Sequence, residues 1–256
     1  MGVRRGLAPV MVMAVMLLGA VTAFAAEAPW PVADIATAPQ DAGGGLIRQG
    51  AALVENTFQY IGPEVKDPAA RVAGNNLACT SCHLRNGTAK LGLPLAGAAE
   101  PLDAKINNCL VTNMNGRPLA ANAPELAAII AYIRFLGGHM SPSVAAEGRG
   151  LPLAVTAGNP AEGRKVFAEV CMICHSGNGL GKRAGEIGDG QGYNVPPVWG
   201  RDSFSSASAF MKLPVLANFI HANMPDGASW DQPLLTPEDA VNAAAFILTA
   251  PRPHRD

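Results

Sequence analysis

The sequence predicts an all-α protein built from two small domains. Apolar residues recur at helical spacing along the chain, and few segments have the alternation that is typical of strands. The chain also repeats itself loosely, because each half contains a helical segment, a Cys-x-x-Cys-His motif, a Gly/Pro-rich loop and a closing amphipathic helix. A length of 256 residues leaves room for two such units.

The composition excludes one broad class of function and leaves room for a cofactor. Only 15% of the residues are charged, and 19 basic residues face 20 acidic ones, so the strong basic excess of a nucleic-acid-binding protein is absent. Aromatic residues make up 5% of the chain and apolar residues 49%. The core must therefore be largely aliphatic, and a large planar cofactor would help to fill it.

Residues 1–25 have the pattern of a Sec-type signal peptide. Arg4 and Arg5 precede the apolar stretch 9–25, and "AFA" at 23–25 fits a cleavage site that would leave Ala26 as the mature start. The arginine pair lacks the flanking residues of a twin-arginine signal, and the alternative is a retained membrane anchor. No later apolar run reaches the length of a bilayer span. We therefore expect an exported, periplasmic protein with no membrane span in its mature form.

The first half, residues 26–140, is predicted to be one domain. Its early helix is "GLIRQGAALVENTFQYIG", and its closing helix is "APELAAIIAYIRFLGG" at 123–138. The closing segment begins with Pro-Glu, which suits a helix N-terminus, and Gly137-Gly138 would end it. Its apolar residues form one stripe at helical spacing: Leu126, Ile129, Ile130, Ile133 and Leu136.

A Gly/Pro-rich linker at 141–157 is expected to join this domain to a second one at 158–256. The second domain should open with a helix from about Pro160 that carries Val166, Phe167 and Val170 up to the next cysteines. It should close with the helix "TPEDAVNAAAFILTAP" at 236–251.

Two Cys-x-x-Cys-His pentapeptides, one in each half, are the strongest chemical signal. In an exported protein this pattern is the attachment signature of c-type haem: two thiols form thioether bonds to the porphyrin, and the histidine is the proximal iron ligand. A thioredoxin-like redox pair lacks its βαβ context, zinc would leave each histidine oddly placed, and disulfides at this spacing would close almost no loop. The sequence therefore predicts two covalently bound haem c groups, held by Cys79, Cys82, His83, Cys171, Cys174 and His175.

The second half resembles a class I cytochrome c domain over most of its length. Such domains take the distal iron ligand from a methionine well downstream of the motif. Met224 in "HANMPDG", 49 residues past His175, is favoured over Met211, 36 residues past it. His221 and Lys212 are weaker candidates.

The first half offers Cys109, Met114, His139 and Met140 as possible distal ligands. Cys109 is 26 residues past His83 and is the fifth cysteine, with no partner left for a disulfide once the thioethers have formed. A free cysteine can simply be a small buried apolar side chain. In an exported protein, however, an unpaired thiol calls for an explanation.

The stretches "AGNNLACTSCHLRNGT", "INNCLVTNMNGRPLA" and "AIIAYIRFL" resemble the dihaem thiosulfate dehydrogenases, as do "VPPVWGRDSF", "FIHANMPDG" and the terminal "APRP". The resemblance covers nearly the whole mature chain. It implies an active-site haem ligated by His83 and Cys109, and a second haem ligated by His175 and Met224 that passes electrons onward. The implied reaction joins two thiosulfate ions into tetrathionate and releases two electrons to a periplasmic cytochrome or another redox acceptor.

A dianionic substrate needs fixed positive charge beside Cys109. Lys105 lies four residues before Cys109 and would share its helix face; Arg117, Lys90 and Arg85 are further candidates. The family has an arginine where Lys105 stands and a serine where Asn113 stands, and the stretch between "CHLRNGT" and "INNC" is shorter here. Lysine supplies charge without the bidentate fork of arginine, so the substrate could be a related small sulfur anion.

Two other functions stay open on the sequence alone. A non-catalytic dihaem electron carrier, serving a dehydrogenase or a terminal oxidase, would account for the altered pocket. A sulfur-carrier cytochrome would use Cys109 to bind a sulfur intermediate or a partner protein. An enzyme with Cys109, Lys105 and Asn113 at its active site is favoured over both.

Overall fold

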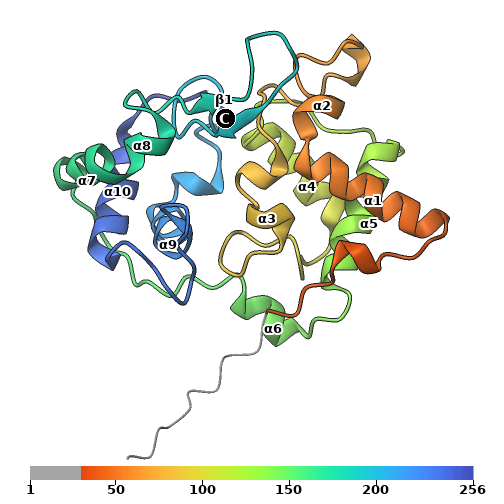
Figure 1. Ribbon diagram of the computed structural model, residues 1–256, viewed down its shortest axis with the longest axis horizontal. Helices are drawn as coiled ribbons and strands as arrows, with labels where there is room; N and C mark the ends of the chain where they lie inside the picture. Colours follow the sequence, from red (N-terminus) through yellow and green to blue (C-terminus); the bar gives the residue numbers. More distant parts are fainter. Residues whose placement is uncertain (1–29, 256) are drawn as a thin grey trace, which may run out of the picture.

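The computed structural model describes residues 30–255, so the expected signal peptide at 1–25 and the mature start at Ala26 lie outside the described residues. Helices dominate this part of the chain, as predicted (Figure 1). Within it, the only sheet is an antiparallel pair of short strands, β1 (Lys182–Arg183) and β2 (Tyr193–Val195). None of the helices within residues 30–255 is both long and apolar enough to cross a bilayer.

The first half has the predicted closing helix, whereas the predicted early helix is divided at Asn56 into two helices. The chain runs through η1 (Ile35–Thr37), α1 (Ala42–Glu55), α2 (Thr57–Ile61), η2 (Pro68–Ala70), η3 (Cys79–Ser81), α3 (Leu84–Gly87), α4 (Leu102–Thr112) and α5 (Pro124–Gly137). The side chains of the expected stripe on α5 are buried, except that Ile130 is only partly buried. Gly138 caps the helix end, as its position in the sequence predicts.

The second half begins with one continuous helical segment that reaches the second motif. It consists of α7 (Pro160–Val166), the π-helical turn η4 (Phe167–Cys171) and α8 (Met172–His175). Further along come η5 (Ala209–Met211), α9 (Leu213–Asn223) and α10 (Pro237–Thr249). The first motif differs, because it begins on the short η3 turn and is separated from α2 by a segment that contains η2.

Each half packs its first helix across its closing helix at a glycine. A Cβ atom on Gly50 of α1 would lie 2.0 Å from the carbonyl oxygen of Ala128 on α5. A Cβ atom on Gly163 of α7 would lie 1.8 Å from the carbonyl oxygen of Asn242 on α10. Only glycine allows the two backbones to approach this closely, so the loose sequence repeat corresponds to a repeated helix crossing.

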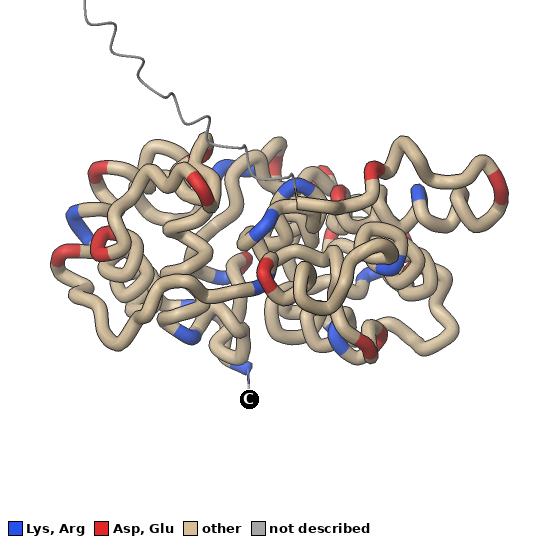
Figure 2. Tube along the Cα trace, turned by 90° about the horizontal axis from the view of Figure 1, so that it is seen from below, with Lys and Arg blue, Asp and Glu red and all other residues tan. Residues whose placement is uncertain are grey.

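Buried apolar side chains form two clusters, one in each half, and Figure 1 shows the helices gathered into two corresponding lobes. The first cluster contains Leu53, Ile129 and Leu136, and the second contains Phe167, Phe219 and Ile247. Acidic and basic residues are interspersed along both lobes in the view of Figure 2.

The segment expected to be a linker, 141–157, is partly ordered into a helix. Pro142–Glu147 forms α6, and Ser141 caps it with a hydrogen bond from the Val144 N–H. Farther along, the Leu153 N–H donates to the side chain of Asn218 on α9. The Gly/Pro-rich composition of this segment did not predict these anchors.

Candidate functional site: two haem attachment sites and the Cys109 cavity

A cavity of about 280 Å³ in the first half brings most of its predicted site residues together. Its wall includes Cys79, Cys82, His83, Cys109 and Met114, with Lys105 and Asn113 beside Cys109. The α4 helix places Lys105 and Cys109 one turn apart on one face, as predicted. The rest of the wall is mostly apolar and includes Leu77, Leu102, Ile129 and Ile133. The structure therefore gathers a Cys-x-x-Cys-His motif and a fifth cysteine around one apolar space.

Each motif histidine is oriented by a hydrogen bond from behind its ring. Nδ1 of His83 bonds to the carbonyl oxygen of Leu93 at 2.5 Å, and Nδ1 of His175 bonds to that of Pro196 at 2.8 Å. Each bond leaves Nε2 free to serve as a ligand and fixes the tautomer that makes this possible. Burial lowers the pKa of both rings, which favours the neutral imidazole that a metal requires.

These observations are a direct test of whether haem c fits, and they agree with it. All five cysteines are free, so Cys79, Cys82, Cys171 and Cys174 are available for thioether bonds. On the wall of the first cavity, Nη2 of Arg149 donates to the carbonyl oxygens of Pro94 at 2.9 Å and Ala96 at 3.1 Å. Arg149 lines the same cavity as His83, and its positive charge suits the propionate of a haem bound there.

Cys109 shares its surroundings with two sulfurs and one amide. Burial, followed by the neighbouring Cys79 and Cys82 thiols, raises the pKa of the Cys109 thiol well above its ordinary value. The Asn113 side chain acts in the opposite direction, because its Nδ2 donates a hydrogen bond to Cys109 Sγ at 3.6 Å. Ionised sulfur at this position therefore needs a strong positive charge beside it, such as a ferric iron.

The other candidate ligands of the first half are placed differently. Met114 is 3% exposed and lines the same cavity as Cys109. His139 is exposed, and Met140 packs against the first core without lining this cavity.

The predicted cations also separate into groups. Lys105 is at the rim of the Cys109 cavity, where its ammonium donates to the carbonyl oxygen of Ala99 at 2.6 Å. Arg117 is bonded instead to the backbone of Ala69 and Arg71. Arg85 and Lys90 line a second, larger cavity of about 760 Å³ on the side of Met224. Lys105 is thus the only one of the four on the wall beside Cys109.

At the second motif, both methionine candidates pack against the second hydrophobic core. Met224 follows α9 directly, and Met211 ends η5. Asn223 ties the Met224 loop to the first half by donating from Nδ2 to the carbonyl oxygen of Leu91 at 3.0 Å. His221 is half-buried and Lys212 is exposed.

The two motifs meet through the second core. Cys82 of the first motif and Cys171 of the second both pack against this cluster. Ala209, Phe210 and Val215 of the second half also line the cavity that contains Cys109. The two motifs therefore both contact one apolar cluster.

Sequence reasoning missed Ser208 and Arg149, which both lie on the wall of this cavity. Arg149 is in the segment interpreted as a linker, and Ser208 is in the serine-rich run "DSFSSASAF". Neither has a motif that would single it out: Arg149 reaches the site because the connecting segment packs on the first half, and Ser208 because the second half does.

The helical fold and the two Cys-x-x-Cys-His motifs with oriented histidines define the class of protein as a c-type cytochrome, which binds haem c covalently. The family model "Cytochrome c" matches residues 160–251. The chain is 31% identical to a thiosulfate dehydrogenase of Stutzerimonas stutzeri, over 84% of this chain and 70% of that protein. It is 30% identical to a thiosulfate dehydrogenase of Allochromatium vinosum, over 70% of this chain and 71% of that protein.

A solved structure supports the same relationship. Thiosulfate dehydrogenase (TsdBA) from Marichromatium purpuratum, in its "as isolated" form, is similar with a TM-score of 0.72 and 28% identity. The match covers 86% of this chain but 48% of that one, so our chain spans about half of its length. The protein belongs to the thiosulfate dehydrogenase family of cytochromes.

Proposed function

We propose that the protein is a dihaem enzyme that oxidises thiosulfate, or a related small sulfur anion, to tetrathionate or the corresponding product. His83 and Cys109 would ligate the active-site iron, and His175 and Met224 the iron of the second haem. The single observation that carries this proposal is the placement of Cys109 in the cavity of the first motif, with Asn113 donating to its sulfur at 3.6 Å.

The chemistry matches a pair of one-electron centres. Two thiosulfate ions each lose one electron, a sulfur–sulfur bond forms between them, and no proton is taken up or released. Bound haem c supplies an iron that accepts one electron at a time and can hold an ionised sulfur. Cys82 and Cys171 pack against the same core, and this shared contact supports electron transfer between the two haems.

The side chains of this chain hold and orient the reactants. Cys109 lines the same cavity as the motif cysteines, and Asn113 donates a hydrogen bond to its sulfur. The ammonium of Lys105 at the rim contributes the fixed positive charge that a dianion needs. The apolar wall limits the access of water to Cys109, which strengthens the hydrogen bond from Asn113 to its sulfur.

We further propose that the chain is organised as a domain at 26–140, a connecting segment at 141–157 and a domain at 158–256. Two separate apolar clusters and two glycine-mediated helix crossings support this division. The predicted signal at 1–25 supports a periplasmic location, with electrons leaving to a cytochrome or another redox acceptor there.

The experiment that tests the proposal is anaerobic mixing of the oxidised holoprotein with thiosulfate. We expect thiosulfate-dependent haem reduction and tetrathionate as product, and both should be lost in Cys109→Gly while both haems stay attached. A wild-type protein that carries two haems but shows neither thiosulfate oxidation nor tetrathionate reduction would instead be an electron carrier.

A further inference from the structure

The amide of Asn113 makes a contact at each of its two ends. Nδ2 donates to Cys109 Sγ at 3.6 Å and to Thr112 Oγ1 at 3.1 Å. On the other end, Oδ1 accepts a hydrogen bond of 2.5 Å from the hydroxyl of Ser208. Because an amide is planar, a partner that fixes its oxygen also fixes where its N–H groups point. Ser208 therefore sets the direction of the donor that faces Cys109.

Ser208 belongs to the other half of the molecule, 95 positions away from Asn113. It is 4% exposed, and its Oγ also accepts a hydrogen bond from the Phe210 N–H at 3.1 Å. A hydroxyl has one proton to donate, and here that proton goes to Asn113. The Ser208 proton is therefore used by Asn113 Oδ1, and burial of Ser208 leaves water little access to replace this hydrogen bond.

The segment that carries Ser208 is fixed to the end of α4 by other bonds. The Ser205 N–H and hydroxyl both donate to the carbonyl oxygen of Thr112, at 3.1 and 2.6 Å. Nδ2 of Asn115 donates to the carbonyl oxygen of Ser203 at 2.8 Å. The position of Ser208 relative to Cys109 is therefore set by the interface between the halves.

We propose that Ser208 is a positioning residue that tunes the Cys109 ligand by orienting the Asn113 amide toward its sulfur. This inference rests on the proposed function, since it takes Cys109 to be an iron ligand. A hydrogen bond to a ligating sulfur withdraws electron density from it and raises the reduction potential of the iron. A residue of the second half thereby helps to set the reduction potential of the haem in the first half.

The test measures the reduction potential of each haem separately in the purified dihaem protein. In Ser208→Ala we expect the reduced-to-oxidised ratio of the first haem, at fixed potential, to fall about fivefold, which is roughly 40 mV for one electron. The potential of the second haem should stay at its wild-type value. Ser208→Thr keeps the hydroxyl and should restore the first potential.

Two further variants separate orientation from a general structural role. Ser205→Ala removes the side-chain hydrogen bond to Thr112 but keeps the one from the Ser205 N–H, so Ser208 should stay in place and the first potential should be unchanged. Ser208→Ala in an Asn113→Ala background should have no additional effect, because the residue through which Ser208 acts is gone.

Three results would overturn the inference. The reduction potential of the first haem could be unchanged in Ser208→Ala, or Ser205→Ala could shift it as much as Ser208→Ala does. The third is that Ser208→Ala shifts it as much in the Asn113→Ala background as in the wild type. Electron paramagnetic resonance of the same samples reports whether Cys109 ligates the iron at all. Absence of the thiolate signature from the wild-type protein would contradict the proposed function. If the signature is present but Ser208→Ala leaves the potential of the first haem unchanged, only this inference is contradicted.

Discussion

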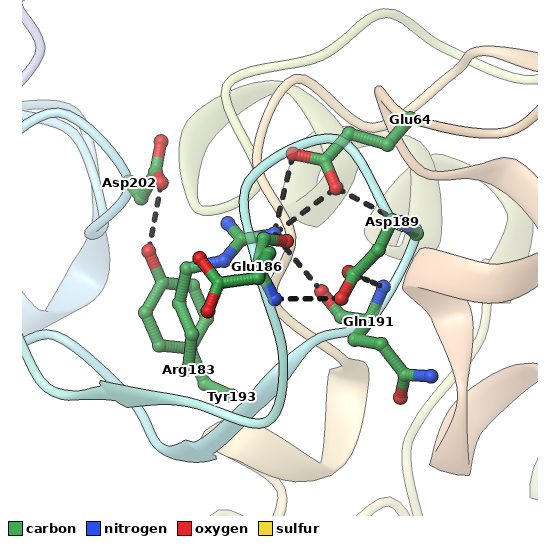
Figure 3. Close-up of polar contacts among 8 residues, drawn as sticks. Glu64, Arg183, Glu186, Asp189, Gln191, Tyr193 and Asp202 are labelled. Atoms are coloured by element: carbon green, nitrogen blue, oxygen red, sulfur yellow. Dashed lines mark hydrogen bonds and ion pairs between the residues drawn. The ribbon is translucent and has the colours of Figure 1, made fainter.

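The carboxylate of Glu64 lies 3.0 Å from the guanidinium of Arg183, and this ion pair joins the loop after α2 to strand β1 of the other half (Figure 3). Both side chains are largely buried, at 16% and 17% exposure. Arg183 also donates to the carbonyl oxygens of Glu186 and Gln191, and the Gly190 N–H donates to Glu64. The pair is therefore part of a network that holds the two halves together.

Removing Arg183 should destabilise the protein measurably. Arg183→Ala leaves the Glu64 carboxylate in a largely buried site without its cation, which costs about 2–4 kcal/mol. The exposed pair of Lys165 and Glu162 is a matched control, and Lys165→Ala should cost less than about 1 kcal/mol. Urea unfolding of the holoprotein measures both changes. An equal decrease in the free energy of unfolding for the two variants would show that the Glu64–Arg183 pair stabilises the protein no more than an exposed ion pair does.

The same pair predicts how stability depends on pH. Burial alone would raise the pKa of Glu64, but hydrogen bonds from Gly190, Asn76 and Gly188 and the charge of Arg183 outweigh it and hold this pKa below its ordinary value of 4.5. A carboxylate with a depressed pKa contributes stability above its unfolded-state pKa and loses that contribution as the pH falls through its folded-state pKa. The stability difference between wild type and Glu64→Gln should thus be constant above pH 5 and shrink below it. A difference that grows on acidification would contradict this assignment.

Met224 and Met211 can be told apart by spectroscopy. Met224→Leu should abolish the methionine-to-ferric charge-transfer band of the second haem, because the thioether sulfur is lost as a ligand. Met211→Leu should retain the band and cost less than about 1.5 kcal/mol of stability, since Leu and Met have similar volumes. The reverse pattern would make Met211 the ligand.

Lys105 is predicted to act on substrate binding through its charge. Lys105→Gln should raise KM for thiosulfate by roughly 3–10-fold with a small change in kcat, and it should weaken the dependence of KM on salt. Lys66, an exposed lysine that does not line the Cys109 cavity, provides the control Lys66→Gln. An unchanged KM in the Lys105 variant would place the substrate away from this rim.

Much of the fold was predictable because helix periodicity and the Cys-x-x-Cys-His pattern are local signals. The closing helices at 124–137 and 237–249 and the helical approach from Pro160 agree with the prediction within a few residues. The contacts made by Ser208, Arg149 and Glu64 were not predictable, because each depends on how distant segments pack. The small sheet was also missed, since strands of two and three residues leave almost no periodicity to detect.

Electron paramagnetic resonance of the fully oxidised protein, compared with Cys109→Ser, tests the central claim most directly. We expect wild type to show one low-spin ferric species with the signature of a thiolate ligand and one with that of a His/Met pair. In Cys109→Ser, the first signature should disappear while the second remains and both haems stay covalently attached. Identical spectra for the two proteins would contradict ligation of the iron by Cys109 and, with it, the enzymatic function proposed here.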